Sequence, residues 1–213
     1  MDFNKIVSEV IKDKFESIET RICPDQFVGR ISSFSATQTN FPIRSTTRDK
    51  NLKCLIMVIE SPHIEEFKGE DTPCPANGKT GEQIRKRITE VKGLYKYKDY
   101  GLIIVNAIQH QCSLGFPTKY FRDAIFKKLW TTEAKGDFIT RLQNIYREND
   151  VIVNRCTKGN KNTKLRLMVQ KSINNLKLDC TILRRTHPSS WFTGKNRNSE
   201  WSYTNSLNHR ANL

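Results

Sequence analysis

Four short apolar runs divide the chain, and each is followed by polar residues. The runs at 52–59 and 101–105 have no regular polar alternation, which is typical of strands buried on both faces. Strands alternating with helices predict a parallel sheet covered on both sides. We therefore expect an α/β fold, a three-layer α/β/α sandwich with a central four-stranded parallel sheet. The other two runs lie at 151–153 and 180–183, and helix-like stretches lie at 82–91, 119–130, 134–148 and 164–176.

Within residues 1–20, apolar side chains recur at helical spacing with charged residues between them. This pattern predicts an amphipathic helix and not a signal peptide. No apolar run approaches the length of a membrane span. Without repeats or obvious linkers, we expect one domain over residues 1–213.

Polar residues that carry chemistry follow each predicted strand. They are Glu60, Asn106, Asn154 and His187. In an open α/β sheet, ligands bind beyond the carboxyl ends of the strands, so these four residues are expected at one edge. Each alone has an ordinary alternative as a turn or cap residue. Together they predict a site.

The chain is strongly basic, with 36 Lys and Arg against 22 Asp and Glu and a net charge of +14. Such a charge favours a polyanionic partner, most often nucleic acid. Solvated surface lysines are the alternative. The excess is spread over the stretches 85–87, 92–98, 158–166, 184–185 and 195–197.

The six cysteines form no CxxC pair and no zinc-like spacing with histidine. Several lie in or beside apolar runs, where free thiols are common. We therefore expect no metal and no other cofactor, and a cytoplasmic monomer in a reducing compartment.

A phosphate-loop motif is suggested by Gly78-Lys79-Thr80 but is incomplete. That motif needs a glycine five residues before its Gly-Lys pair, and position 73 is proline. This excludes a P-loop NTPase. Gly78 and Gly81 still allow backbone amides to approach a DNA phosphate, with Lys79 beside them.

Four segments together carry a resemblance to a known family. They are IESPH at 59–63, PANGKTG at 75–81, IIVNA around Asn106, and HPSSW at 187–191. In this order, after successive strands, they are similar to the motifs of the uracil-DNA glycosylase superfamily. The similarity covers roughly residues 50–209, which we expect to form the core.

The resemblance implies that a nucleotide is flipped out of DNA and its N-glycosidic bond hydrolysed. Glu60 would stabilise the oxocarbenium-like transition state or position water. His187 would stabilise the departing base, and Asn106 would read a pyrimidine edge. His63 and Asn154 are further candidates for substrate binding. Glu65, Glu66 and Asp71 remain alternatives to Glu60 as the acid.

The chain departs from the family pattern at three positions: Ile59 replaces a glycine, Ser61 replaces an acid or amide, and Ala76 aligns with the aromatic on which uracil stacks. Base stacking contributes about 1–3 kcal/mol, so Ala76 predicts weaker uracil binding and a larger pocket. We therefore expect a bulkier pyrimidine, such as hydroxymethylated or glucosylated cytosine in phage DNA, and a defence role.

The alternatives are repair of uracil or deaminated bases, and a non-catalytic DNA-binding protein. The cysteine pattern of the iron–sulfur branch is not reproduced.

The last motif also predicts a DNA-facing loop. Ser189 and Ser190 would approach the DNA, and Trp191 stands where relatives place the residue that fills the gap left by the flipped nucleotide. In the alternative, Trp191 packs under the loop, and Phe192 or Lys195 meets the DNA.

Overall fold

The computed structural model describes residues 3–11, 19–68, 72–112, 121–154 and 165–199, and the backbone of 201–204. At its centre is a six-stranded sheet with the order β1-β3-β2-β4-β5-β6. The strands are β1 (Gln26–Arg30), β2 (Cys54–Ile59), β3 (Gly101–Asn106), β4 (Val151–Asn154), β5 (Thr181–Arg184) and β6 (Trp201–Thr204).

The four strands predicted from the apolar runs are parallel and adjacent, in the order β3-β2-β4-β5. The prediction of a four-stranded, entirely parallel sheet is nevertheless wrong, because the sheet has six strands. β1 adds to β3 and β6 adds to β5, both antiparallel. β1 lies before residue 50, so the sheet also includes residues outside the 50–209 segment that we expect to form the core.

The chain order makes this a doubly wound sheet. The connection from β2 to β3 runs through α2, and the return across β2 to β4 runs through α3 and α4. The chain adds β3 on one edge of β2 and then β4 on the other edge, so the switch point lies at the carboxyl ends of β2 and β4. The helices are α1 (Phe3–Ile11), α2 (Lys79–Arg87), α3 (Arg122–Leu129), α4 (Lys135–Ile145), α5 (Leu165–Asn175) and α6 (Gly194–Arg197).

Short helical turns complete the connections. Trp130–Ala134 is a π-helical turn, η5, that joins α3 to α4. The others are 3₁₀ turns: η1 (Ile31–Ser33), η2 (Ile64–Phe67), η3 (Ile88–Glu90), η4 (Tyr95–Tyr97) and η6 (Pro188–Ser190).

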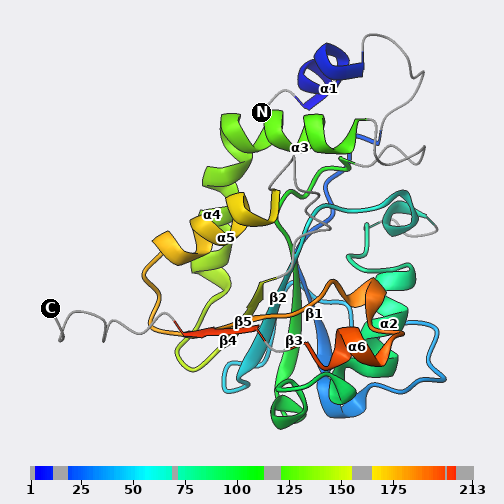
Figure 1. Ribbon diagram of the computed structural model, residues 1–213. Coiled ribbons are helices and arrows are strands. Elements are labelled where there is room, and N and C mark those ends of the chain that lie inside the picture. The colour runs from blue at the N-terminus through cyan, green and yellow to red at the C-terminus, as the bar shows by residue number, and fades with distance from the viewer. Residues whose placement is uncertain are drawn as a thin grey trace, which may run out of the picture.

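Helices cover both faces of the sheet, so three layers result (Figure 1). On β2, Ile56 and Val58 join the core beneath α1, α3, α4 and α5, whereas Leu55 and Met57 join the core beneath α2. This alternation explains why the run lacks a polar face: both faces are buried.

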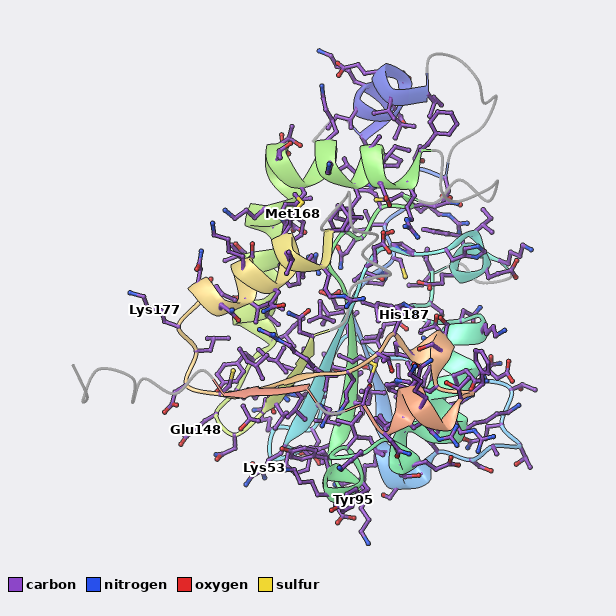
Figure 2. All side chains as sticks on the ribbon, viewed as in Figure 1. Lys53, Tyr95, Glu148, Met168, Lys177 and His187 are labelled. Atoms are coloured by element: carbon purple, nitrogen blue, oxygen red, sulfur yellow. The ribbon has the colours of Figure 1, made fainter. Side chains whose placement is uncertain are left out.

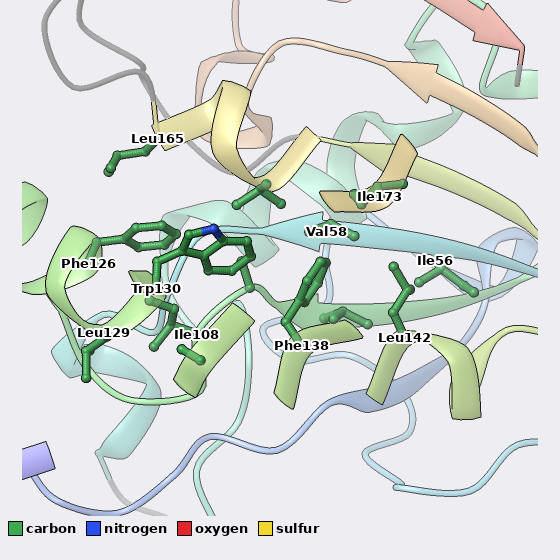
Figure 3. Close-up of a cluster of buried hydrophobic side chains, with 14 of the residues drawn as sticks. Ile56, Val58, Ile108, Phe126, Leu129, Trp130, Phe138, Leu142, Leu165 and Ile173 are labelled. Atoms are coloured by element: carbon green, nitrogen blue, oxygen red, sulfur yellow. The ribbon is translucent and has the colours of Figure 1, made fainter. Parts of the chain in front are cut away.

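The larger core is built around aromatic side chains (Figure 3). Trp130 stacks on Phe126 at 5.6 Å and meets Phe138 at 5.5 Å, measured between ring centroids. Burying such a side chain stabilises the fold by about 1.5–3 kcal/mol. The predicted N-terminal helix is present at α1, where Phe3, Val7 and Ile11 are buried against this core; residues 12–18 lie outside the described part of the chain.

Part of the basic charge is structural. Arg85 is buried and donates to the carbonyls of Gln38 and Thr39. Arg185 is buried too, and donates to the carbonyl of Lys92. Two of the predicted basic stretches therefore contribute partly to packing, and residues 158–164 of a third lie outside the described residues. No helix in the described ranges has the length and apolar character to cross a membrane.

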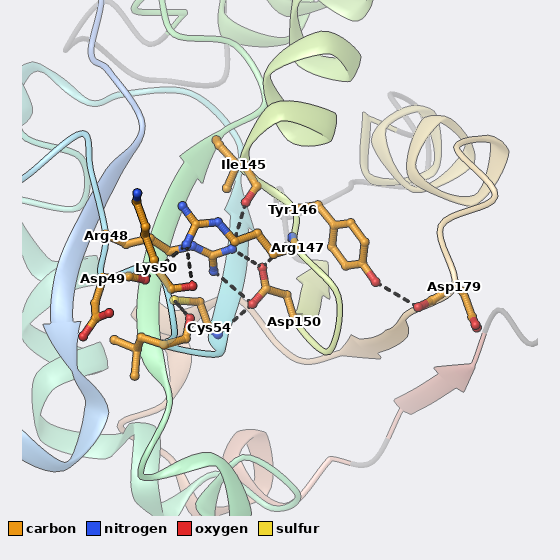
Figure 4. A network of polar contacts seen from close by, with 10 residues as sticks. Arg48, Asp49, Lys50, Cys54, Ile145, Tyr146, Arg147, Asp150 and Asp179 are labelled. Atoms are coloured by element: carbon orange, nitrogen blue, oxygen red, sulfur yellow. Dashed lines mark hydrogen bonds and ion pairs between the residues drawn. The ribbon is translucent and has the colours of Figure 1, made fainter.

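A buried ion pair ties together the amino ends of β2 and β4 (Figure 4). Both oxygens of Asp150 lie 2.8–2.9 Å from Arg48 guanidinium nitrogens. The same carboxylate accepts from the backbone N–H of Cys54 at 2.8 Å and of Arg147 at 2.9 Å. Asp150 therefore joins the starts of two neighbouring strands and the loop before β2.

We predict that Asp150→Ala lowers the free energy of unfolding by about 3–5 kcal/mol, because Arg48 is then left buried without its partner. Urea unfolding monitored by circular dichroism measures this change. The matched control is Asp179→Ala, at an exposed carboxylate, for which we expect a change within about 0.5 kcal/mol. Equal costs for the two variants would contradict the assignment.

Candidate active site

A cavity of about 320 Å³ opens beyond the carboxyl end of β2, at the switch point of the sheet. It is bordered by the β2–α2 connection, the start of α2, the start of α3 and the segment after β5. The lining residues are Ile59, Glu60, Ser61, Pro62, His63, Glu65, Glu66, Gly78, Lys79, Thr80, Arg122 and His187. Glu60 and His187, predicted from distant parts of the sequence, therefore line one cavity.

Glu60 follows β2 directly, and its backbone is fixed. Its carbonyl accepts from the N–H of Ile108 at 3.0 Å, and only 8 % of the residue is exposed. One carboxyl oxygen lies 3.3 Å from Nε of Arg122. Burial raises the pKa of Glu60 to about 8; Arg122 lowers it and Asp123 raises it further. Glu60 is thus an acid that titrates near neutral pH.

His187 is held by the loop that it begins. Its Nδ1 accepts from the backbone N–H of Ser189 at 3.2 Å and lies 2.8 Å from the Ser189 hydroxyl. In a neutral imidazole whose Nδ1 accepts, Nε2 carries the proton and is a donor. The residue lies in the segment between β5 and α6 (Figure 2). Ser190 closes the turn by donating its hydroxyl to the His187 carbonyl at 2.7 Å.

Of the other candidate acids, only Glu66 is buried like Glu60. Burial raises the pKa of Glu66 to about 8, whereas the backbone of Ala76 and His63, the Asn106 amide and the Cys23 thiol lower it. The Cys23 thiol donates to its carboxyl group at 3.7 Å, which ties the β2–α2 connection to the segment before β1. Glu65 is exposed and pairs with Lys68 at 2.7 Å, and Asp71 lies outside the described residues.

His63 lies at the mouth of the cavity. It is exposed, and its Nδ1 accepts from the N–H of Glu65 at 3.3 Å, so it caps η2. This position is compatible with substrate contact as well as with a purely local role.

Asn106 and Asn154 lie at the carboxyl ends of β3 and β4, as predicted, and these two strands flank β2. Both are buried, and neither lines the cavity. The Asn106 amide lies beside the Glu66 carboxyl and lowers its pKa. Even so, no side-chain amide atom of either asparagine makes a hydrogen bond of good geometry within the described part of the chain.

The structure does not place Ala76 on the cavity. Its side chain is fully buried in the core beneath α2, and its φ of 56° is left-handed. Its carbonyl approaches Gly81 so closely that a Cβ on Gly81 would collide with it. The small side chain at position 76 reflects this tight turn, so it does not enlarge the cavity as the resemblance implied.

Trp191 is also placed differently from its predicted position against DNA. The residue is fully buried in the core beneath α2, and its Nε1 donates to the carbonyl of Thr186 at 2.9 Å. The neighbouring Phe192 is 60 % exposed, and Nζ of Lys79 lies 5.6 Å from its ring centroid. The alternative, in which Trp191 packs under the loop and Phe192 projects outward, is the one the structure supports. Lys195, on α6, is exposed as well.

Arg122 is the lining residue that sequence reasoning missed. It is the first residue of α3, and nothing in the local sequence distinguishes it from other surface arginines. Its role at the cavity is set by tertiary structure, because α3 places it against Glu60. Among the described residues, no three His, Cys, Asp or Glu side chains gather as a metal site would require.

Comparison with protein-family models, curated proteins and solved structures gave no match. The function is therefore argued from the residues of the cavity.

We predict that Glu60→Gln stabilises the protein at high pH. The pKa of Glu60 is about 8 in the folded state and about 4.3 in an unfolded chain, so ionisation of the folded protein at high pH costs stability. The variant should melt a few degrees above the wild type at pH 9, since 1 kcal/mol shifts Tm by about 2–4 °C at this size. The difference should shrink toward about pH 3, which lies below both pKa values, so that Glu60 is largely protonated in the folded and the unfolded state. Thermal unfolding across this range measures it, and a constant difference would contradict the buried titration.

Proposed function

We propose that the protein is a monofunctional DNA glycosylase that removes a modified pyrimidine flipped out of DNA. The observation that carries the proposal is that a buried acid, Glu60, and an oriented histidine, His187, line one cavity at the carboxyl edge of the sheet. The reaction needs these two groups. A carboxylate stabilises the positive charge of the sugar, and a donor stabilises the negative charge of the base.

In this mechanism the C1′–N bond breaks and its electron pair leaves with the base. Water then forms the new C1′–O bond, and its proton passes to the Glu60 carboxylate. Because Nδ1 of His187 accepts from Ser189, the neutral imidazole carries its proton on Nε2, and we assign this N–H as the donor to an oxygen of the departing base. The cavity volume of about 320 Å³ falls at the lower end of the range for small-ligand sites, as suits a single nucleobase.

The rim of the cavity suits a polyanion. Lys79 lines the cavity and lies over the ring of the exposed Phe192. A projecting apolar ring beside a cation is the kind of surface that enters a base stack and meets the phosphates on either side. We propose that Phe192 fills the gap left by the flipped nucleotide and that Lys79, Gly78 and Lys195 contact the backbone.

We extend the proposal to a cytosine carrying a hydroxymethyl or glucosyl group, as in phage DNA, and hence to a defence role. Ala76 no longer supports this extension. What supports it is that no Phe, Tyr or Trp occurs among the described residues lining the cavity, so uracil would lack a stacking partner of about 1–3 kcal/mol. We place the reaction in a cytoplasmic monomer, and the free thiols of the five described cysteines agree with a reducing compartment.

The test is abasic-site formation on duplex and single-stranded oligonucleotides, read by alkaline cleavage. The substrates carry uracil, cytosine, 5-hydroxymethylcytosine or glucosylated hydroxymethylcytosine. We expect cleavage of a modified cytosine, with Glu60→Gln and His187→Ala each slowing it by about 10²–10³-fold. Ready release of uracil alone would indicate a repair enzyme. Binding of DNA without abasic sites on any substrate would indicate a non-catalytic binding protein and end the proposal.

We predict that substitution of the two neighbouring aromatics affects different properties: excision from duplex DNA for Phe192 and stability for Trp191. Phe192→Ala should leave the free energy of unfolding nearly unchanged and reduce excision from duplex DNA far more than from single strands, because only the duplex has a gap to fill. Trp191→Ala should cost about 3–5 kcal/mol of stability, since it empties a buried site. Equal losses on duplex and single-stranded substrates for Phe192→Ala would refute the role assigned to its ring.

A further inference from the structure

Arg122 is the cation nearest to the buried acid. Its Nε lies 3.3 Å from Oε1 of Glu60, and the two side chains are 20 % and 11 % exposed. Oε1 accepts no hydrogen bond from the described residues. The contact is therefore an ion pair without a hydrogen bond between the two side chains. Because both side chains are largely buried, water screens this ion pair little.

The guanidinium is in turn held by its neighbour. Nε of Arg122 donates to Oδ1 of Asp123 at 2.9 Å, and Nη2 lies 2.8 Å from the same oxygen. Asp123 thus fixes the guanidinium at the start of α3. The same carboxylate raises the pKa of Glu60, whereas Arg122 lowers it more strongly. The two adjacent residues act on Glu60 in opposite directions, and the cation dominates.

The other groups near Glu60 do not replace this cation. The Cys112 thiol is buried, and its pKa is raised by burial and by Glu60, so it stays neutral at ordinary pH. The remaining titratable groups that line the cavity come from η2, α2 and the loops before η2 and η6; they are His63, Glu65, Glu66, Lys79 and His187. Of the cationic side chains among them, none forms an ion pair with Glu60 in the described part of the chain.

We propose that Arg122 is the positioning residue that favours the ionised form of the Glu60 carboxyl group and directs it at the cavity, with Asp123 holding Arg122 in place. The significance for catalysis rests on the proposed function, since only an ionised Glu60 can stabilise a cationic sugar or accept a proton from water. The electrostatic coupling itself does not depend on the reaction. A protein that excised no base would still show it.

The experiment is a direct titration of Glu60. Glutamate-labelled protein is followed by carboxyl carbon NMR between pH 5 and pH 10, and the Glu60 resonance is assigned by its loss in Glu60→Gln. The variants are Arg122→Gln, Arg122→Lys and the control Lys128→Gln. Lys128 is an exposed cation on the same helix, but it pairs with Glu9 and not with Glu60.

We expect Arg122→Gln to raise the titration midpoint, so that the ionised fraction of Glu60 at pH 7 falls about tenfold, because an opposite charge at this distance favours the ionised form. Arg122→Lys should restore part of the shift, and Lys128→Gln should leave the midpoint unchanged. An unchanged midpoint in folded Arg122→Gln would overturn the inference. Should that variant not fold, an unchanged midpoint in Arg122→Lys together with Asp123→Asn would do the same.

Abasic-site formation by the same proteins separates this inference from the proposed function. If Arg122→Gln shifts the Glu60 midpoint but the wild-type protein releases no base, the coupling is supported and the glycosylase proposal ends. Base release with a pH profile that Arg122→Gln does not move refutes the coupling and leaves the glycosylase intact. A profile displaced to higher pH in step with the midpoint supports both.

Discussion

The site depends on the burial of β2. This strand has parallel neighbours on both edges and a packed core on both faces, so the chain leaving its carboxyl end emerges where water is scarce. Glu60 is the first residue to leave. Its carbonyl is fixed to the segment after β3 by a backbone hydrogen bond, and only 8 % of the residue is exposed. An acid with a raised pKa at this point is a consequence of the topology, and the cavity beside it is where the strand order reverses.

The strong basic charge is divided between structure and surface. Arg85 and Arg185 are buried and satisfy backbone carbonyls, and Arg48 joins the strand starts through Asp150. These arginines hold the scaffold and are not available to a partner. Lys79 remains exposed at the cavity, next to the exposed Phe192 ring, and Lys195 is exposed on α6. The basic charge that a polyanion could reach is therefore smaller than the net charge suggests.

The interior strands could be predicted from the sequence because a strand buried on both faces must be an unbroken apolar run. β1 and β6 could not be predicted, since their sequences QFVGR and WSYT are not apolar runs. They are strands because they pair with β3 and β5, the outer strands of the parallel set. Glu60 and His187 could be placed at one edge by topology alone. Arg122 could not, because its approach to Glu60 depends on how α3 packs.

Ala76 and Trp191 show where alignment with a family pattern fails. Both are directed into the core by local geometry: a left-handed turn closed against Gly81 and an indole that donates to the carbonyl of Thr186. A motif fixes the order of residues along the chain, but which of two adjacent aromatics points outward is decided by packing. The same limit applies to Asn106, whose position at the end of β3 was predicted and whose burial was not.

The central claim is that Glu60 and His187 together break a glycosidic bond to a base held in this cavity. Mass spectrometry of the bases released from a panel of natural phage DNAs, incubated with the wild-type protein and with Glu60→Gln, tests it most directly. The account predicts release of a free modified cytosine base from DNA that contains it, from the wild type and not from the variant. Recovery of every DNA with its bases intact would contradict it.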